Sequence, residues 1–254
     1  MYKPVLVPGL VRTALIATWV VIGGAANAMD GQMRASEILA QADEARGNLD
    51  GVEWQLHLRA EDNKDEQEMT MAVQARGFDV VTTTLAPAHS KGNLLLMLKE
   101  NMWFDRPGLS KPVPISKRQK LMGTAAYGDI ATTDYANDYN PTLVGEEVVE
   151  GKPCWVYDLQ AKHRNVTYDR IKYWVQKDQM IGLKAEYFTV SGKIIKSAKM
   201  EYANRVERDG QLKPFISRII ISGELLQNEQ TVLTLTNPVL RKIPDYVFDL
   251  SLYQ

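Results

Sequence analysis

Apolar and polar side chains alternate most clearly over Val52–Arg59, where every second position is apolar. Successive side chains of a strand point to opposite faces of a sheet, so this pattern predicts a strand with one buried and one solvated face. Met69–Ala75 repeats the alternation, and Phe78–Leu85 continues it with many valines and threonines, which favour strands. This part of the chain therefore predicts a run of paired strands.

The stretch Lys91–Gly123 presents large apolar side chains and few groups capable of chemistry. Two apolar runs, Leu94–Leu98 and Met102–Phe104, flank a polar turn and predict two further strands. From Pro114 to Pro141 the pattern breaks, and we expect a loop with one or two helical turns near Tyr127–Thr132. A connection this long in a compact domain is often a lid or a binding loop.

Strand patterns joined by short polar turns dominate the rest of the chain. They include Thr142–Val149, Cys154–Gln160, Arg170–Gln176, Lys193–Glu207 and Thr231–Thr236, and the segment Asn237–Pro244 reads as a tail. The one strong helical pattern begins at Ser36, a candidate N-cap, and stops before Gly47. We count about ten or eleven strands, which predicts a mainly β protein with a few helices and one large, curled antiparallel sheet. Its concave face would be covered by the helix and by the insert at 117–140.

The N-terminus has the pattern of a secretory signal peptide. A positive region with Lys3 and Arg12 precedes a mostly apolar stretch, and Ala26-Asn27-Ala28 is a typical cleavage site. We therefore predict a signal peptide over residues 1–28 and a single domain over residues 29–254, with an uncleaved anchor as the alternative. Because no cysteine follows the cleavage site, we expect no lipidation there.

Charge and hydropathy narrow the classes of partner. Removal of residues 1–28 would take two of the 30 basic residues and none of the 31 acidic ones, which leaves a net charge of −3. This charge argues against a nucleic-acid partner. No later apolar run approaches the length of a membrane helix, so we expect the mature protein not to span a membrane.

The sequence offers little for catalysis or metal binding. The single cysteine, Cys154, follows Pro153 within an apolar strand and is better explained as a small buried side chain than as a nucleophile. The three histidines, His57, His89 and His163, lack the spacing of a metal site, and no nucleotide-binding or serine-hydrolase motif is present. We therefore predict no catalytic residue, no metal, no cofactor and no enzymatic activity.

Methionines and tryptophans are spread over the predicted strands and loops. On pattern alone an ordinary packed core is the simpler interpretation, but a curled sheet under a thin cover can enclose more space than its side chains fill. Methionine also suits surfaces that contact variable apolar ligands. The candidate cavity wall is Trp54, Leu56, Leu58, Met69, Met71, Leu94, Leu96, Trp103, Tyr173, Leu183 and Tyr187, and the candidate lid residues are Met122, Tyr127 and Ile130.

Four segments carry, in order, a family resemblance. They are Gly92–Pro107 with Trp103-Phe104 and the closing proline, Leu121–Ile130 with Met-Gly-Thr and Tyr-Gly-Asp, the hairpin Tyr173–Lys193, and Thr231–Phe248 with its closing Pro-Asp-Tyr-Val-Phe. In these segments the chain resembles the LolA/LolB-like superfamily, and within it the outer membrane lipoprotein-sorting proteins of Gram-negative bacteria. The basic loop after Pro107 is milder than in those relatives, and Thr124 stands where serine is usual.

The resemblance implies a half-barrel closed by helices and a lid over an apolar cavity. It also implies a periplasmic carrier or chaperone that binds lipid or lipoprotein acyl chains for transport between the inner and outer membranes. Its partners would be a lipid or an acylated lipoprotein, and an inner-membrane transporter or an outer-membrane acceptor. A non-enzymatic adaptor of such a transporter or of an envelope assembly, with its cavity packed shut, is the alternative reading, and a hydrolase is a third.

Overall fold

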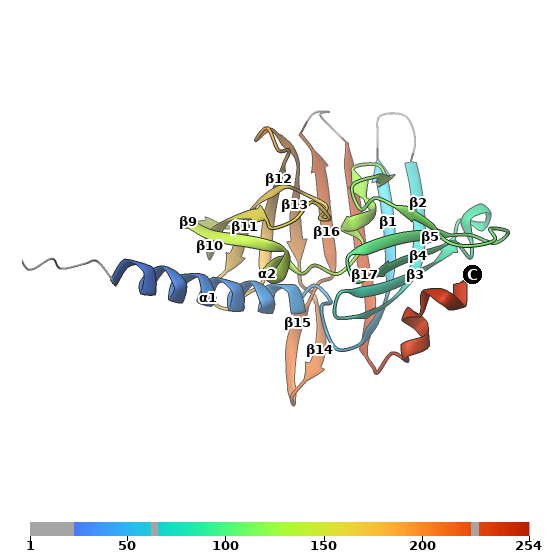
Figure 1. The fold of residues 1–254 in the computed structure, drawn as a ribbon, viewed down its shortest axis with the longest axis horizontal. Helices are drawn as coiled ribbons and strands as arrows, with labels where there is room; N and C mark the ends of the chain where they lie inside the picture. Colours follow the sequence, from blue (N-terminus) through green and yellow to red (C-terminus); the bar gives the residue numbers. More distant parts are fainter. Residues whose placement is uncertain (1–22, 62–65, 225–228, 254) are drawn as a thin grey trace, which may run out of the picture.

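A computed structural model describes residues 23–61, 66–224 and 229–253 of the chain. The protein is mainly β, as the alternation predicts, and its largest element is one curved antiparallel sheet of 13 strands (Figure 1). Residues 1–22 of the predicted signal peptide lie outside the described residues. The signal peptide and the domain boundary at residue 28 therefore stay predictions.

The first half of the sheet is a meander that starts at its centre and runs to one edge. β1 pairs with β2 so that apolar residues face each other, with Trp54 opposite Val73 and Leu56 opposite Met71. This register places both apolar rows on one face, as the period of two requires. The strands are β1 (Val52–Glu61), β2 (Glu66–Arg76), β3 (Asp79–Ala86), β4 (Leu94–Leu98), β5 (Asn101–Asp105) and the edge strand β6 (Val113–Ile115), and the 3-10 helix η1 (Ala88–Ser90) precedes β4.

The second half starts at the opposite edge and returns to the centre, where β17 pairs with β1. Its strands are β9 (Tyr139–Val149), β10 (Lys152–Ala161), β11 (Arg170–Gln176), β12 (Gly182–Phe188), β13 (Ile194–Glu201), β16 (Arg218–Gly223) and β17 (Gln230–Leu240). A separate hairpin, β14 (Asn204–Arg208) and β15 (Gln211–Phe215), projects between β13 and β16 (Figure 1). The order of the described strands leaves β6 and β9 as two edges, so the sheet is a half-barrel.

The helix α1 (Gly23–Glu44) lies on the concave face of the sheet. Leu39 and Ala42 are fully buried and belong to the same core as Trp54, Leu56 and Tyr173. The helix ends in a Schellman motif, because the N–H of Asn48 donates to Asp43 O and the N–H of Gly47 to Glu44 O. Gly47 has φ +102, which confirms its predicted role as the stop. The predicted start at Ser36 is wrong, since the alanine-rich residues before it continue the helix back to Gly23.

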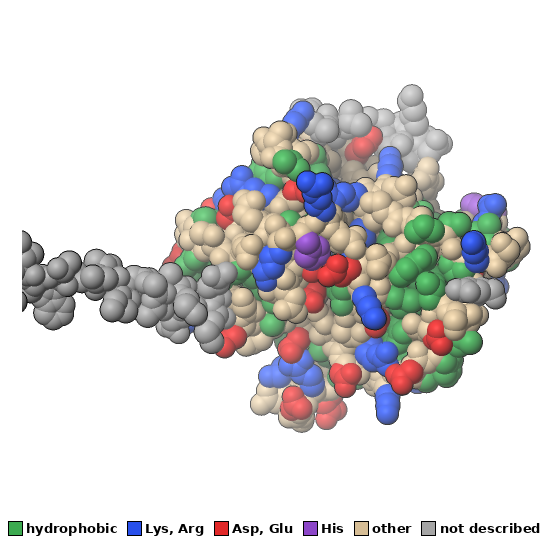
Figure 2. Space-filling model, viewed as in Figure 1, with side chains coloured by type: hydrophobic (Ala, Val, Ile, Leu, Met, Phe, Trp, Pro, Cys, Tyr) green, Lys and Arg blue, Asp and Glu red, His purple; other side chains and the backbone are tan. Residues whose placement is uncertain are grey.

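The outer face of the sheet near β3–β5 has its own cover at the C-terminus. Two 3-10 helices, η3 (Asp245–Phe248) and η4 (Leu250–Tyr253), lie there, and Ile243 and Val247 are buried against Leu96 and Val81. This part of the sheet is therefore apolar on both faces. Figure 2 shows apolar side chains gathered over this end of the molecule, with charges of both signs mixed over the rest of that face.

The strand count differs from the prediction, because the described residues form 17 strands rather than ten or eleven. β6, β7 (Lys120–Met122) and β8 (Ala125–Ala126) are too short for an alternating pattern to reveal. Lys193–Glu207 divides into β13 and β14. The tail predicted at Asn237–Pro244 instead extends β17 to Leu240, and a bulge opposite Trp54 accommodates Pro238, which cannot donate to the ladder.

Within the described part of the chain, no helix combines the length and the hydrophobicity that a membrane crossing needs.

Candidate ligand-binding site

One segment joins the two edges of the sheet across its concave face, and we call residues 116–138 the cover segment. It leaves β6, contains β7, β8, the 3-10 helix η2 (Tyr127–Asp129) and the short helix α2 (Tyr135–Asp138), and enters β9. Met122 and Ile130 are buried in the core beneath it, and Tyr127 packs against that core. The short helical turns near Tyr127–Thr132 are thus confirmed, and the predicted lid residues lie between the cover and the sheet.

The first anchor of the cover segment is the turn between β7 and β8. The N–H of Thr124 donates to Thr231 Oγ1 of β17 (2.8 Å), and the Thr124 hydroxyl donates to Ile221 O of β16 (3.0 Å). A Cβ on Gly123 would overlap Thr231 Oγ1 and would lie 2.6 Å from Ala60 Cβ. Gly123 also has φ +51, so only glycine lets the turn press this closely onto the sheet.

The second anchor is a buried ion pair between η2 and β13. Lys196 Nζ lies 2.7 Å from Asp129 Oδ2, with side chains only 9% and 7% exposed. The other contacts complete the pair: the Tyr168 hydroxyl donates to Asp129 Oδ1 (2.6 Å), the N–H of Ala126 to Asp129 Oδ2 (2.8 Å), and Lys196 Nζ to Thr124 O (3.0 Å). Buried charges need such full pairing, so this contact ties the cover specifically to the sheet.

The third anchor joins the cover segment to α1. The buried Asp43 accepts hydrogen bonds from the Thr133 hydroxyl (2.7 Å) and from the N–H of Ala136 (3.0 Å) at the start of α2. Burial raises the pKa of Asp43 from its ordinary value of 3.8 to about 7, although these hydrogen bonds act in the opposite direction. The charge of this anchor therefore changes near neutral pH.

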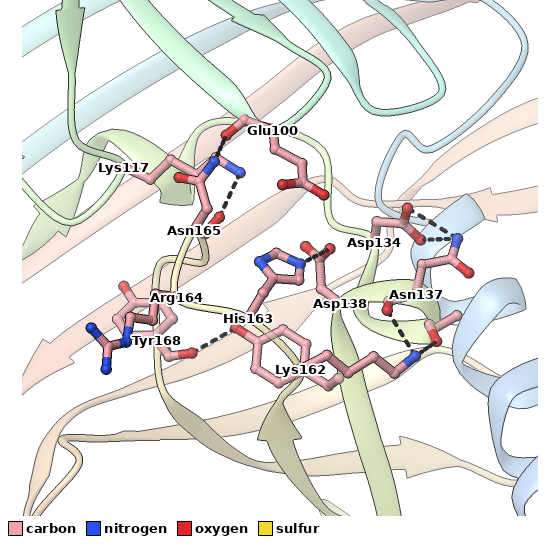
Figure 3. A network of polar contacts seen from close by, with 12 residues as sticks. Glu100, Lys117, Asp134, Asn137, Asp138, Lys162, His163, Arg164, Asn165 and Tyr168 are labelled. Carbon is pink, nitrogen blue, oxygen red and sulfur yellow. Dashed lines mark hydrogen bonds and ion pairs between the residues drawn. The ribbon is translucent and has the colours of Figure 1, made fainter.

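Polar contacts also join the two ends of the cover segment to the β10–β11 loop (Figure 3). Lys117 Nζ donates to Asn165 O (3.1 Å), and His163 Nε2 lies 3.1 Å from Asp138 Oδ1. Arg118 forms an ion pair with Asp169 (2.8 Å) at the rim. Burial raises the pKa of Asp138 and lowers that of Lys117, because each charge is partly removed from water.

An enclosed chamber of about 30 Å³ lies under the cover segment. Its wall mixes apolar side chains such as Phe78 and Met97 with charged ones, Arg46 and Lys117 among them. This volume holds about one or two water molecules and no acyl chain. In this conformation the chamber beneath the cover segment therefore has no room for the acyl chain that the predicted cavity would hold.

A larger groove of about 610 Å³ lies outside the chamber, between the β7–β8 turn and the β12–β13 turn. Phe188 and Ile195 give it an apolar wall, while Arg118 and Lys120 stand at its side. Tyr168 and Thr167 line both the groove and the chamber. Because Lys196 lines the groove and its partner Asp129 lines the chamber, their ion pair separates the two spaces.

Most predicted wall residues lie together on the concave side. Those in the main core are Trp54, Leu56, Leu58, Met71, Tyr173 and Tyr187, with Met69 packed against it. Leu183 lies apart, in a second cluster with Cys154, Val156 and Trp174. No ligand-binding role follows from these positions alone, so that role stays a prediction.

The inward orientation predicted for Leu94, Leu96 and Trp103 is wrong. Leu96 pairs with Trp103 and with Val81 in the neighbouring strands. These side chains and that of Leu94 pack under the C-terminal cover on the outer face. Their neighbours Leu95, Met97, Met102 and Phe104 face the core instead. A shift of one residue moves a side chain to the other face of a sheet. The run Leu94–Leu98 is apolar at every position, so its pattern could not reveal which residues face inward.

Several charged residues of the site were missed by sequence reasoning. They are Asp43, Arg46, Asp129 and Lys196, which lie far apart in the sequence and have no motif spacing. Asp129 did fall within the Tyr-Gly-Asp motif that carries the family resemblance. A Cβ on Gly128 of that motif would overlap Thr167, which explains why the turn needs glycine.

Cys154 is fully buried, and burial raises the pKa of its thiol, which disfavours the nucleophilic thiolate. Among the described residues no group of three or more histidine, cysteine, aspartate or glutamate side chains could hold a metal ion.

Known proteins share this fold over almost its full length. A LolA superfamily protein from Nitrosomonas europaea is 30% identical to the chain, with a TM-score of 0.75; the match covers 85% of this chain and 97% of that one. The chain belongs to the LolA superfamily. A family model, described only as that of an uncharacterized protein, matches residues 79–252 of this chain.

Two further structures share the LolA-like fold at lower identity. A DUF1329 family protein from Desulfovibrio piger is 19% identical (TM-score 0.73, covering 88% of this chain and 99% of that one). A putative outer membrane lipoprotein-sorting protein domain from Vibrio parahaemolyticus is 15% identical (TM-score 0.73, covering 86% and 97%). No curated protein matches the chain. The Nitrosomonas relative confirms the predicted superfamily, and all three structures confirm the half-barrel fold.

Proposed function

We propose that this LolA superfamily protein is a non-enzymatic periplasmic carrier. It binds the acyl chains of lipids or lipoproteins against the concave face of the sheet, for transfer between the inner and outer membranes. The observation that carries the proposal is the cover segment: one continuous stretch crosses an apolar concave face and is held at its anchors by polar contacts. The printed description of the Vibrio relative as a lipoprotein-sorting domain supports the same class of cargo.

Binding requires the cover segment to move. The chamber of about 30 Å³ excludes an acyl chain, so the chain must replace contacts that Met122 and Ile130 now make with the core. Each methylene removed from water contributes about 0.8 kcal/mol, which for a long chain can offset the cost of opening. Release follows when the cover segment closes again, with the groove beside the Asp129–Lys196 pair as the mouth.

A reversible lock on the cover segment tests this proposal. The hydroxyls of Thr124 and Thr231 lie 2.9 Å apart, so Thr124→Cys with Thr231→Cys places two sulfurs within bonding reach. The double variant is made in a Cys154→Ala background, which leaves no other thiol. We expect the oxidised protein to take up no fluorescent fatty acid and the reduced protein to bind it, while each single variant binds under both conditions.

Two results would contradict the carrier proposal. Equal uptake by the oxidised and reduced double variant would show that the ligand does not enter beneath the cover segment. Native mass spectrometry of protein purified without detergent gives the second check. Lack of any co-purified lipid, together with no uptake by the unlocked protein, would exclude a lipid carrier.

The packed chamber favours a second candidate function, a non-enzymatic adaptor of an inner-membrane transporter or an envelope assembly. The edge strand β9 supports it, because its Leu143 and Val148 are 54% and 70% exposed beside unpaired backbone groups. Crosslinking in cells distinguishes the two. An adaptor keeps its protein partner when the cover segment is locked by oxidation, whereas a carrier loses contact with lipid under the same condition.

A further inference from the structure

A buried arginine of the chamber lacks a counter-ion. Arg46 follows α1, is only 7% exposed and lines the chamber. Among the described residues, no carboxylate lies within ion-pair distance of its guanidinium, and its Nη1 is buried without a hydrogen-bond partner. A guanidinium stays charged at all accessible pH values, and an unpaired buried charge is costly. This arrangement is typical of a site whose anion comes from outside the chain.

Other unsatisfied donors surround the same arginine. The phenol groups of four tyrosines lie near enough to Arg46 to act on its pKa: Tyr135, Tyr173, Tyr187 and Tyr202. Its Cζ lies 5.4 Å from the centre of the Tyr135 ring, and that ring meets Tyr173 edge to face at 5.2 Å. In the described part of the chain, the hydroxyls of Tyr173 and Tyr202 are buried without partners, like Arg46 Nη1. Arg46 Nη1 and the two tyrosine hydroxyls are thus three buried donors that have no hydrogen-bond partner among the described residues.

The nearby acids are committed to other partners. Asp43, one helical turn before Arg46, accepts its hydrogen bonds from Thr133 and Ala136 of the cover segment. Asp129 is paired with Lys196, and Asp138 with His163 (Figure 3). Lys117, the other buried cation of the chamber wall, already donates to Asn165 O, whereas Arg46 Nη1 has no partner, so Arg46 is the cation with a free donor for an incoming anion.

We infer that Arg46, with the hydroxyls of Tyr173 and Tyr202, binds the carboxylate of a long-chain fatty acid whose alkyl chain lies on the concave face. This inference rests on the proposed function and names the class of cargo. A carboxylate is planar, carries one negative charge and accepts several hydrogen bonds, which matches one guanidinium and two phenols. The same chamber offers Phe78 and Met97 to the start of the alkyl chain. A neutral acyl ester would leave the arginine unpaired.

Headgroup discrimination tests the inference. Delipidated full-length protein is titrated with palmitic acid, hexadecanol and hexadecyl phosphate, each by displacement of a fluorescent probe. We expect wild-type protein to bind palmitic acid at least about tenfold more tightly than hexadecanol, as a charged hydrogen bond supplies. Arg46→Met should abolish this preference and leave the affinity for hexadecanol unchanged. Arg218→Met, an exposed arginine of β16 that pairs with Glu201, is the matched control and should keep the preference.

The tyrosines provide a second test that does not depend on the folding of the arginine variant. Tyr202→Phe keeps the ring and removes one donor, so the preference for the acid should fall by about threefold, the effect of a neutral hydrogen bond. Arg46→Lys keeps the charge and should retain part of the preference. An unchanged preference in Tyr202→Phe and in Arg46→Met would overturn the inference.

The remaining outcomes separate the two proposals. Equal binding of palmitic acid and hexadecanol by wild-type protein would overturn the anion site but leave the carrier proposal standing. Failure to bind any of the three amphiphiles would overturn the carrier proposal itself. A stronger preference for hexadecyl phosphate, lost in Arg46→Met, would overturn the assignment to a carboxylate and assign the site to a phosphate headgroup.

Discussion

The sheet carries two covers, one on each face, and they are held in different ways. The outer cover, formed by η3 and η4, packs Ile243 and Val247 against Leu96 and Trp103 in an apolar cluster. The inner cover segment also buries apolar side chains, but its fixed points are the Asp129–Lys196 ion pair and the hydrogen bonds of Thr124 and Asp43. Apart from one exposed ion pair between Arg76 and Asp245, the outer cover therefore depends on area, and the inner one depends on directional contacts.

In the proposed carrier, this difference separates a permanent layer from a movable one. Apolar packing is non-directional, so any displacement of the outer cover exposes apolar surface to water, and no new contact offsets this cost. Polar groups that separate can instead be hydrated, and the net loss for each hydrogen bond is about 1 kcal/mol. In the proposed carrier, an acyl chain also replaces the apolar contacts of the inner cover. We therefore expect the inner cover to open while the sheet stays folded.

The buried ion pair gives the largest expected effect. Lys196→Met leaves Asp129 buried without its cation, and we expect the free energy of unfolding to fall by about 3–5 kcal/mol. Hydrogen exchange should rise in residues 116–138 before it rises in β1 and β17. Urea unfolding and exchange mass spectrometry measure the two effects.

A double variant provides the control for this prediction. Asp129→Asn with Lys196→Met removes both charges, so it should be more stable than Lys196→Met alone. If the double variant loses the sum of the two single losses, the pair is not coupled, and the cover is held by other contacts.

The contrast between covers also explains what the sequence could and could not predict. Val52–Arg59 has one wet face, so its alternation identified the strand and the inward residues. Leu94–Leu98 is covered on both faces, so its apolar run identified a strand but not its orientation, and Leu96 was placed on the wrong side. The local sequence pattern cannot predict which residues face inward where a strand is covered on both faces.

The charged anchors were beyond sequence reasoning for a different reason. Lys196 lies on a strand with other lysines and looks like an ordinary surface residue, and its burial arises only when η2 reaches β13. Arg46 likewise became notable only because the structure places it in a chamber without a counter-ion. Gly123 and Gly128 of the cover segment stood out in the sequence as parts of motifs. Their close approach to Thr231 and Thr167, which requires glycine, could be found only in the structure.

The outer cover should respond in the opposite way to the inner one. Leu96 is fully buried between β3–β5 and the C-terminal helices, and Leu96→Ala should lower the free energy of unfolding by about 3 kcal/mol through loss of packing. Because this loss is global, exchange in residues 116–138 should rise no more than in β1. Preferential opening of the cover segment in Leu96→Ala would break the comparison.

The turn of the inner cover gives a smaller effect with an internal control. Gly123→Ala adds a methyl group against Thr231 and Ala60, whereas Gly192 also has positive φ (+80) but meets no described atom within 4 Å. We expect Gly123→Ala to lower the free energy of unfolding by about 2 kcal/mol more than Gly192→Ala, as overpacking does. If chemical denaturation shows equal losses of stability for the two variants, the β7–β8 turn can move away from the sheet at little cost.

Titration of Asp43 gives the smallest expected effect, because pH changes the charge of the inner cover without a substitution. Burial holds the pKa of this acid at about 7 in the folded protein, against 3.8 ordinarily, so the folded state binds the extra proton between these values. The contribution of Asp43 to stability therefore falls as pH rises through this window, by about 1.4 kcal/mol per pH unit at most. Asp43→Asn should remove that slope, measured as the difference between the urea stability curves of variant and wild type. A parallel pair of curves would place the titration in another group.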